Sequence, residues 1–146
     1  MNKNILVIGV STNSGTIHTV KENNKYLSSA LEAIPISGII RKSHFEDFRQ
    51  QFMKSFGYKN PLGVATRLLC VKRPDYFVGI NNANRIALCE ALDSKKSLNL
   101  AEYWEEIIEP IIASNWWKAT IPNNDTEKQV FNARVAFLDA IYYEPI

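Results

Sequence analysis

The residues of this sequence that could do chemistry gather between positions 57 and 92, and their types suit the binding of phosphates. A Pro/Gly turn at residues 61–63 precedes an apolar helical pattern. Backbone amides at a helix N-terminus, with the positive end of the helix dipole, favour an anion. Basic side chains around this turn would strengthen the positive field: Lys59, Arg67, Lys72, Arg73 and Arg85. Amide side chains that could contact bases follow in a turn: Asn81, Asn82 and Asn84. The segment therefore predicts a nucleic-acid-binding surface.

The order of these features resembles a known superfamily. Residues 62–65, LGVA, and residues 74–85, PDYFVGINNANR, are similar to the hairpin and the following segment of the helix-hairpin-helix DNA glycosylases. The resemblance implies that the backbone amides of Gly63, Val64 and Ala65 reach a phosphate of DNA. It also implies a setting in bacterial DNA processing, restriction or phage defence.

The resemblance argues against base excision. Asn81 stands where the superfamily carries its catalytic aspartate, and a neutral amide can neither stabilise an oxocarbenium-like centre nor activate an attacking group. Arg67 lies near the position of the lysine nucleophile of some members, but a guanidinium stays protonated. We therefore expect a non-catalytic DNA-binding domain. An enzyme that uses Asn81 or Asp75 in an unfamiliar reaction is one alternative.

Charge and aromatic content support a second alternative, a protein-interaction or assembly subunit. Residues 41–96 carry eleven Lys and Arg against five Asp and Glu, whereas residues 97–146 carry three against eight. The basic middle would attract phosphates. The acidic C-terminal half holds Trp104, Trp116 and Trp117, and aromatic side chains are enriched at the cores of protein interfaces. These tryptophans could therefore bind a protein partner or a second copy of the chain.

Composition limits the class of protein. A chain of 146 residues with 46% hydrophobic and 22% charged residues can form one domain with its own core. Cys70 and Cys89 lie in apolar helical patterns, which predicts buried, reduced thiols in a cytoplasmic protein. Neither a metal-binding cysteine motif nor a His/Cys cluster is present, so we expect no metal and no cofactor. The apolar run at residues 5–10 is too short for a membrane span.

The expected fold is mainly α, a single domain over residues 1–146. Residues 1–22 should form a short β-hairpin or extended arm, and residues 23–146 a compact bundle of about six helices. The expected helices cover residues 24–34, 43–56, 64–71, 84–92 (or 82–92), 99–112 and 126–143. Proline residues at 35 and 74 should end two of them, and Pro110 should bend or end the fifth.

Capping and packing residues follow from the same patterns. We expect a Ser43–Glu46 capping box, a cap at Asn99, and a cap at Asp125 or Thr126. The last helix carries a broad apolar face: Val130, Phe131, Val135, Phe137, Leu138, Ile141 and Tyr142, with Arg134 among them. A buried charge needs a partner, so Arg134 should pair with a glutamate of the acidic helix face. That face consists of Glu102, Glu105, Glu106 and Glu109.

Overall fold

The computed structural model describes residues 25–56 and 61–146, and every regular element in these ranges is helical. The elements are α2 (Lys25–Glu32), α3 (Lys42–Phe56), α4 (Leu62–Lys72), α5 (Arg85–Ala91), the π-helical turn η1 (Trp104–Ile108), α6 (Glu109–Ala113), α7 (Asp125–Asn132) and α8 (Leu138–Ile141). The prediction of a mainly α fold is confirmed. The predicted arm or hairpin at residues 1–22, and the connection between α3 and α4 at residues 57–60, lie outside the described residues.

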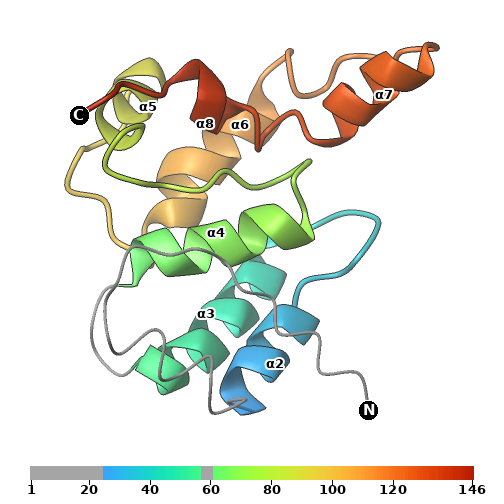
Figure 1. The fold of residues 1–146 in the computed structure, drawn as a ribbon. Coiled ribbons are helices and arrows are strands. Elements are labelled where there is room, and N and C mark those ends of the chain that lie inside the picture. The colour runs from blue at the N-terminus through green and yellow to red at the C-terminus, as the bar shows by residue number, and fades with distance from the viewer. Residues whose placement is uncertain (1–24, 57–60) are drawn as a thin grey trace.

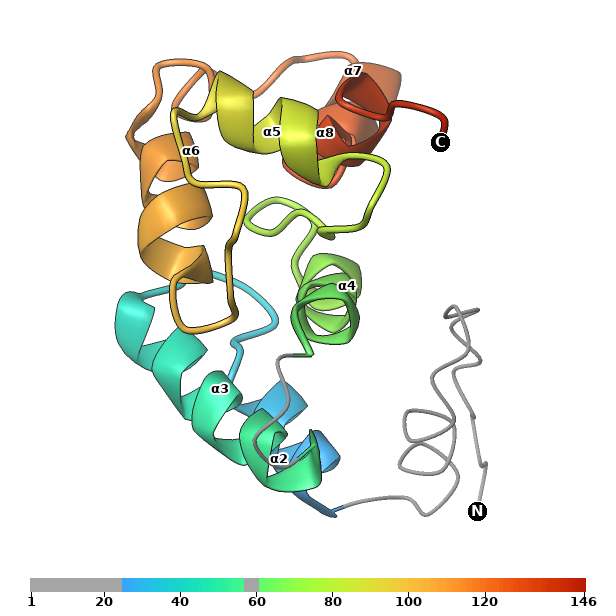
Figure 2. The same ribbon diagram turned by 90° about the vertical axis from the view of Figure 1, so that its left-hand side faces the viewer.

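The helices form two groups, and residues 73–84 lie between them. We call these residues the extended segment. Helix α4 crosses the middle of the molecule, with α2 and α3 on one side and α5 to α8 on the other (Figures 1 and 2). The chain after α4, from residue 73 to residue 84, runs between α4 and the C-terminal helices in both views. This segment therefore joins the two groups.

The first group is held by aromatic packing. Phe45, Phe48 and Phe52 recur at helical spacing on α3 and are fully buried. The rings of Phe48 and Phe52 stack with centroids 5.3 Å apart. Apolar residues of α2 pack on this face, and the chain turns after Pro35 through Gly38, which has φ of 76°. Only glycine adopts that backbone conformation without steric cost.

The start of α3 differs from the prediction. The helix begins at Lys42, and the Nδ1 atom of His44 accepts a hydrogen bond from the Arg41 amide at 3.1 Å. Glu46 forms an ion pair with Arg49 at 2.8 Å. The predicted Ser43–Glu46 capping box is therefore wrong, because His44 binds the amide at the start of the helix and Arg49 binds the Glu46 carboxylate.

Residues 76–80 of the extended segment are part of the core. Phe77 and Val78 are fully buried and Ile80 is nearly so. A buried backbone needs hydrogen-bond partners, and no second strand lies beside this one in the described part of the chain. Side chains take that role. The hydroxyl of Tyr103 donates to the Val78 carbonyl at 2.7 Å and accepts from the Val78 amide at 3.1 Å.

Two further side chains complete this hydrogen bonding. The hydroxyl of Thr66 accepts from the Ile80 amide at 2.9 Å and donates to the Leu62 carbonyl at 2.8 Å. The side-chain amide of Asn84 donates to the Gly79 carbonyl at 2.7 Å. The extended segment is thus fixed by polar groups from α4, from the acidic helix region and from the N-terminus of α5.

Arg73, at the end of α4, connects the first group of helices to the segment that follows α4. Its guanidinium binds both carboxylate oxygens of Asp75 at 2.8 Å. It also donates to the carbonyl of Pro35 at 2.9 Å and to that of Gly38 at 2.8 Å. The side chain is only 7% exposed and lies over the ring of Tyr76. One arginine therefore fixes the α2–α3 loop to the start of the extended segment.

The acidic helix is capped where the sequence indicates. Asn99 accepts from the Glu102 amide and Glu102 accepts from the Asn99 amide, which is a capping box. The cap predicted at Asn99 is confirmed. Pro110 lies in the first turn of α6 and has no amide to donate. The π-helical turn η1 precedes it, and the Glu109 amide bonds back to the Trp104 carbonyl, five residues earlier.

The predicted last helix is divided into α7 and α8. The Ala136 amide donates to the Pro74 carbonyl at 2.9 Å instead of to a carbonyl of its own helix. Val135 is fully buried at this break. A contact with the extended segment therefore interrupts the helix, and the prediction of one helix over residues 126–143 is wrong. The cap is Asn124, whose side chain accepts from the Thr126 and Glu127 amides, so the predicted cap is displaced by one or two residues.

None of the described helices has the length and apolar character needed to cross a membrane.

Candidate interaction groove

The predicted phosphate-binding turn is built into α4. Gly63 and Val64 lie in the first turn of the helix, which begins at Leu62. A Cβ atom at Gly63 would lie 3.4 Å from the Ile80 carbonyl oxygen, so this glycine faces the extended segment. Ala65 is fully buried and its amide donates to the Pro61 carbonyl at 2.9 Å. The expectation that the Ala65 amide is available to an anion is therefore wrong.

The basic residues of this region have different roles. Lys59 lies outside the described residues. Arg67 is exposed on α4, whereas Lys72 donates to the Leu31 carbonyl and Arg73 is buried against Asp75. A phosphate could reach Arg73 only if its four hydrogen bonds were broken. Of the three basic residues predicted on α4 and at its end, Arg67 is thus the exposed one.

The predicted asparagines lie at the start of α5, and they are brought together there. The side-chain Oδ1 of Asn81 accepts from the backbone amides of Ala83 and Asn84, and the Oδ1 of Asn84 accepts from the backbone amide of Asn81. Both side chains donate to the carboxylate of Asp139 on α8. Asn82 is exposed and Arg85 is partly buried. A carboxylate at the centre of this cluster opposes the approach of a phosphate.

The three tryptophans of the predicted partner interface have different surroundings. Trp104 is 3% exposed in the core, and its indole donates to Glu109 at 3.1 Å. The indole of Trp117 donates to the Asp75 carbonyl at 2.8 Å. Trp116 is 46% exposed. Of the three, Trp116 is therefore the one available to a partner.

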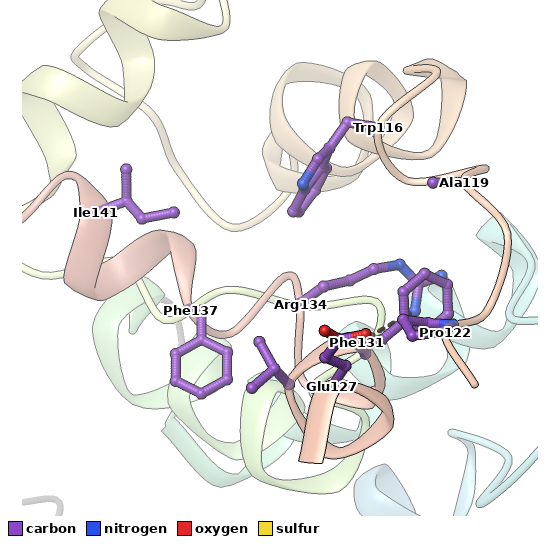
Figure 3. Close-up of a pocket in the computed structure, with 9 residues that line it drawn as sticks. Trp116, Ala119, Pro122, Glu127, Phe131, Arg134, Phe137 and Ile141 are labelled. Atoms are coloured by element: carbon purple, nitrogen blue, oxygen red, sulfur yellow. Dashed lines mark hydrogen bonds between the residues drawn. The ribbon is translucent and has the colours of Figure 1, made fainter. Parts of the chain in front are cut away.

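Trp116 lines an open groove of about 320 Å³ in the C-terminal part of the molecule. Its walls come from the segment after α6, from α7 and from α8 (Figure 3). The lining residues are Trp116, Ala119, Pro122, Glu127, Val130, Phe131, Arg134, Phe137 and Ile141. Val130, Phe137 and Ile141 are exposed by 51%, 45% and 66%. We call this surface the C-terminal groove.

Arg134 lies inside the C-terminal groove between two aromatic rings. Its guanidinium is 4.1 Å from the centre of the Phe131 ring and 4.8 Å from that of Trp117. It donates to the Phe131 carbonyl at 3.0 Å and to the Trp117 carbonyl at 3.2 Å. Burial lowers the pKa of this guanidinium. The prediction that Arg134 pairs with a glutamate is wrong, because carbonyl oxygens and ring faces stabilise it instead.

Sequence reasoning missed the groove because it assigned Val130, Phe137 and Ile141 to the buried face of one helix. The break between α7 and α8 changes the direction of these side chains. One signal was present: the apolar face of residues 126–143 is wider than a helix needs to cover a core. A helix with such a face either lies wholly in the core or presents part of the face to another surface.

Other groups with possible chemistry are isolated from the groove. Cys70 and Cys89 are free thiols, and burial raises the pKa of each above its ordinary value. A raised pKa disfavours the reactive thiolate. Within residues 25–56 and 61–146, no three His, Cys, Asp or Glu side chains are grouped so that they could hold a metal ion.

Comparison with known proteins finds no match for this chain among family models, curated proteins or solved structures.

Proposed function

We propose that this chain is a protein-interaction module that binds an apolar segment of a partner protein in the C-terminal groove. The observation that carries the proposal is the exposure of Trp116, Phe137 and Ile141 around one hollow. A contiguous apolar surface of this kind is costly in water and marks an interaction site in many proteins. Aromatic anchors in a pocket supply most of the binding free energy at protein interfaces.

The groove indicates what the partner segment should contain. Burial of each large apolar side chain contributes about 1.5–3 kcal/mol, and association itself costs several kcal/mol. Two or three aliphatic or aromatic residues in the groove would therefore give weak, transient binding, of micromolar order. Glu127 at the groove favours a Lys or Arg beside the apolar residues of the partner.

Nucleic-acid binding was the first expectation from the sequence, and it makes a different experimental prediction. Of the basic residues predicted to contact phosphates, Lys72 and Arg73 are bound to other parts of the chain. Arg67 and Arg85 are therefore the residues to test. Their reversal to glutamate should abolish binding to DNA if they contact phosphates. Such binding would weaken by orders of magnitude between low and physiological salt, because counterions are released.

The test is a selection of displayed 12-residue peptides on the immobilised full chain. Selected peptides are synthesised and their affinities measured by fluorescence polarisation. We expect sequences with two or three large apolar residues, micromolar affinity, and at least about tenfold weaker binding to Phe137→Asp/Ile141→Asp. The matched control is Ile36→Asp/Ile39→Asp, which changes two exposed isoleucines of the α2–α3 loop, 84% and 67% exposed, and should leave binding unchanged.

Two outcomes would contradict the proposal. One is a set of selected peptides that bind the groove variant as well as they bind the parent. The other is the failure of selection together with salt-sensitive retention of a DNA duplex in a gel shift that Arg67→Glu/Arg85→Glu removes. The second outcome would assign the chain to nucleic-acid binding.

A further inference from the structure

We propose that the C-terminal groove is a binding site for a carboxylate, and that Arg134 binds it. In the partner segment this group is the side chain of an Asp or Glu that lies among the apolar residues. The inference rests on the proposed function and deepens it, because it names a chemical group that the bound segment carries. Two arginines of the chain, Arg73 and Arg134, have similar surroundings, but Arg134 lacks the carboxylate that binds Arg73.

Arg73 shows how this fold stabilises a guanidinium that is withdrawn from water. It lies over the ring of Tyr76 and donates to the carbonyls of Pro35 and Gly38. It also binds both carboxylate oxygens of Asp75. The carboxylate compensates the charge, while the ring face and the carbonyl oxygens bind the rest of the group. A complete set of partners thus contains a ring, carbonyl oxygens and a carboxylate.

Arg134 has the rings and the carbonyl oxygens but not the carboxylate. Its guanidinium lies over the rings of Phe131 and Trp117. Its Nε donates to the Trp117 carbonyl and its Nη1 to the Phe131 carbonyl. Among the residues that the structure describes, Nη2 donates to no group and no Asp or Glu forms an ion pair with Arg134. Nη2 is therefore available to an anion.

Asp75 does not supply the missing carboxylate. Its charge acts to raise the pKa of Arg134, but burial acts more strongly, and the pKa is lowered. Both oxygens of Asp75 are bound by Arg73 at 2.8 Å. The charge of Arg134 is thus incompletely compensated. A partly buried cation attracts an anion more strongly than an exposed one, because the effective dielectric constant around it is lower.

This guanidinium lies in the groove proposed for the partner. Arg134 is one of the lining residues, and Figure 3 shows its side chain extending below Trp116 toward the ring of Phe131. A segment that packs on both Trp116 and Phe131 therefore also covers the guanidinium. Such a segment removes water from Nη2, and the loss is costly unless the segment supplies an acceptor. A wholly apolar segment is accordingly a poor ligand for this groove.

Glu127 narrows the class of anion. This exposed residue lines the same groove. A phosphate group carries nearly two negative charges at neutral pH, so Glu127 repels it about twice as strongly as it repels a carboxylate. A carboxylate also has a planar shape that matches the guanidinium fork. These properties favour an Asp or Glu of the partner over a phosphorylated residue.

The first test uses the peptides selected by display on the full chain. The acid of each peptide is replaced by its amide, Asp by Asn or Glu by Gln, and the affinity for the parent is measured by fluorescence polarisation. We expect the amide forms to bind at least about tenfold more weakly, because a charge-assisted contact is lost. Selected peptides without an acid, or amide forms that bind the parent as tightly as the acids, would overturn the inference.

A variant then assigns the preference to one residue. Acid and amide peptides should bind Arg134→Met with equal affinity, since methionine fills similar space without a charge. The matched control is Arg67→Met, which removes the same charge from the exposed face of α4 and should keep the preference for the acid. A preference that survives in Arg134→Met would overturn the inference. If Arg134→Met does not fold, the comparison of acid and amide peptides on the parent still decides.

The second test needs no partner segment. Phenylacetate offers one ring and one carboxylate, and phenylacetamide is its neutral counterpart. Each compound is titrated to millimolar concentration into the isotope-labelled full chain, and NMR spectra record the Arg134 Nε–H and Trp116 indole N–H signals. We expect phenylacetate to shift both signals and phenylacetamide to shift them much less. Equal shifts with the two compounds, or no shift with either, would overturn the inference.

The two proposals can fail separately. If selected peptides bind the groove equally well in acid and amide forms, the proposed function stands and the inference falls. If no peptide is selected but phenylacetate alone shifts the Arg134 signal, the carboxylate site at Arg134 stands and the protein-interaction function falls.

Discussion

The hydroxyl of Tyr103 binds both the amide and the carbonyl of Val78 in the fully buried centre of the molecule. This contact replaces the neighbouring strand that an extended backbone ordinarily requires. It connects the acidic helix region to the segment between the two groups of helices. The phenol therefore fixes the start of η1 to the middle of this segment.

Loss of this phenol should destabilise the protein strongly. Tyr103→Phe keeps the ring but leaves two buried backbone groups without a partner. We expect the free energy of unfolding to fall by about 2–4 kcal/mol, measured by urea denaturation. Tyr143→Phe is the matched control, because Tyr143 is exposed, and it should change stability by less than about 0.5 kcal/mol. A loss below about 1 kcal/mol in Tyr103→Phe would contradict the role assigned to the hydroxyl.

The same residue predicts a dependence of stability on alkaline pH. Burial raises the pKa of Tyr103 well above its ordinary value of 10. Above pH 10 the unfolded chain therefore loses this proton while the folded chain keeps it. The contribution is fully present below the unfolded pKa and is lost as the pH rises toward the folded pKa, by at most about 1.4 kcal/mol per pH unit. Urea denaturation between about pH 8 and pH 11 should show a smaller decline in Tyr103→Phe than in the parent. Equal slopes would contradict the prediction.

Arg73 should not tolerate replacement by lysine. Arg73→Lys keeps the charge but cannot bind both Asp75 oxygens and two carbonyls with one planar fork. We expect a loss of about 2–3 kcal/mol in the free energy of unfolding. The comparison is Arg49→Lys, whose partner Glu46 is about one-third exposed, and which should cost less than about 1 kcal/mol. Similar losses in the two variants would show that the buried contacts of Arg73 contribute little.

Substitution of Gly63 tests whether this glycine occupies an ordinary helical position or a strained turn. Its position in α4 is helical, and a Cβ atom would make an ordinary contact of 3.4 Å with the Ile80 carbonyl oxygen. Gly63→Ala should therefore leave stability unchanged or raise it by up to about 1 kcal/mol. Gly63→Val should lower stability by more than about 1 kcal/mol, because its branched side chain would press on the extended segment. A large loss on Gly63→Ala in thermal denaturation would contradict this geometry.

The sequence predicted most of the local structure. Sequence patterns located α2, α3, α4 and α5, and the cap at Asn99 was identified from residue type. These features depend on neighbours in the chain, so a local pattern is sufficient to find them. The Ser43–Glu46 box failed because Arg49 competes for the same carboxylate.

The features that were missed depend on contacts between distant residues. The Ala136–Pro74 hydrogen bond divides the last helix, and no pattern within residues 126–143 indicates it. The candidate groove depends on this contact between distant residues, which is why Val130, Phe137 and Ile141 were assigned to the buried face of one helix.

The π-helical turn η1 holds one residue more than an α-helical turn, since the Glu109 amide bonds to a carbonyl five residues earlier. The chain rotates less per residue in this wider turn, so the extra residue is absorbed locally. The side chains after it keep the directions that an uninterrupted α-helix with one residue fewer would give them. Ile111, which is 2% exposed, therefore stays in the core, and the chain leaves α6 toward Trp116 with the insertion already accommodated.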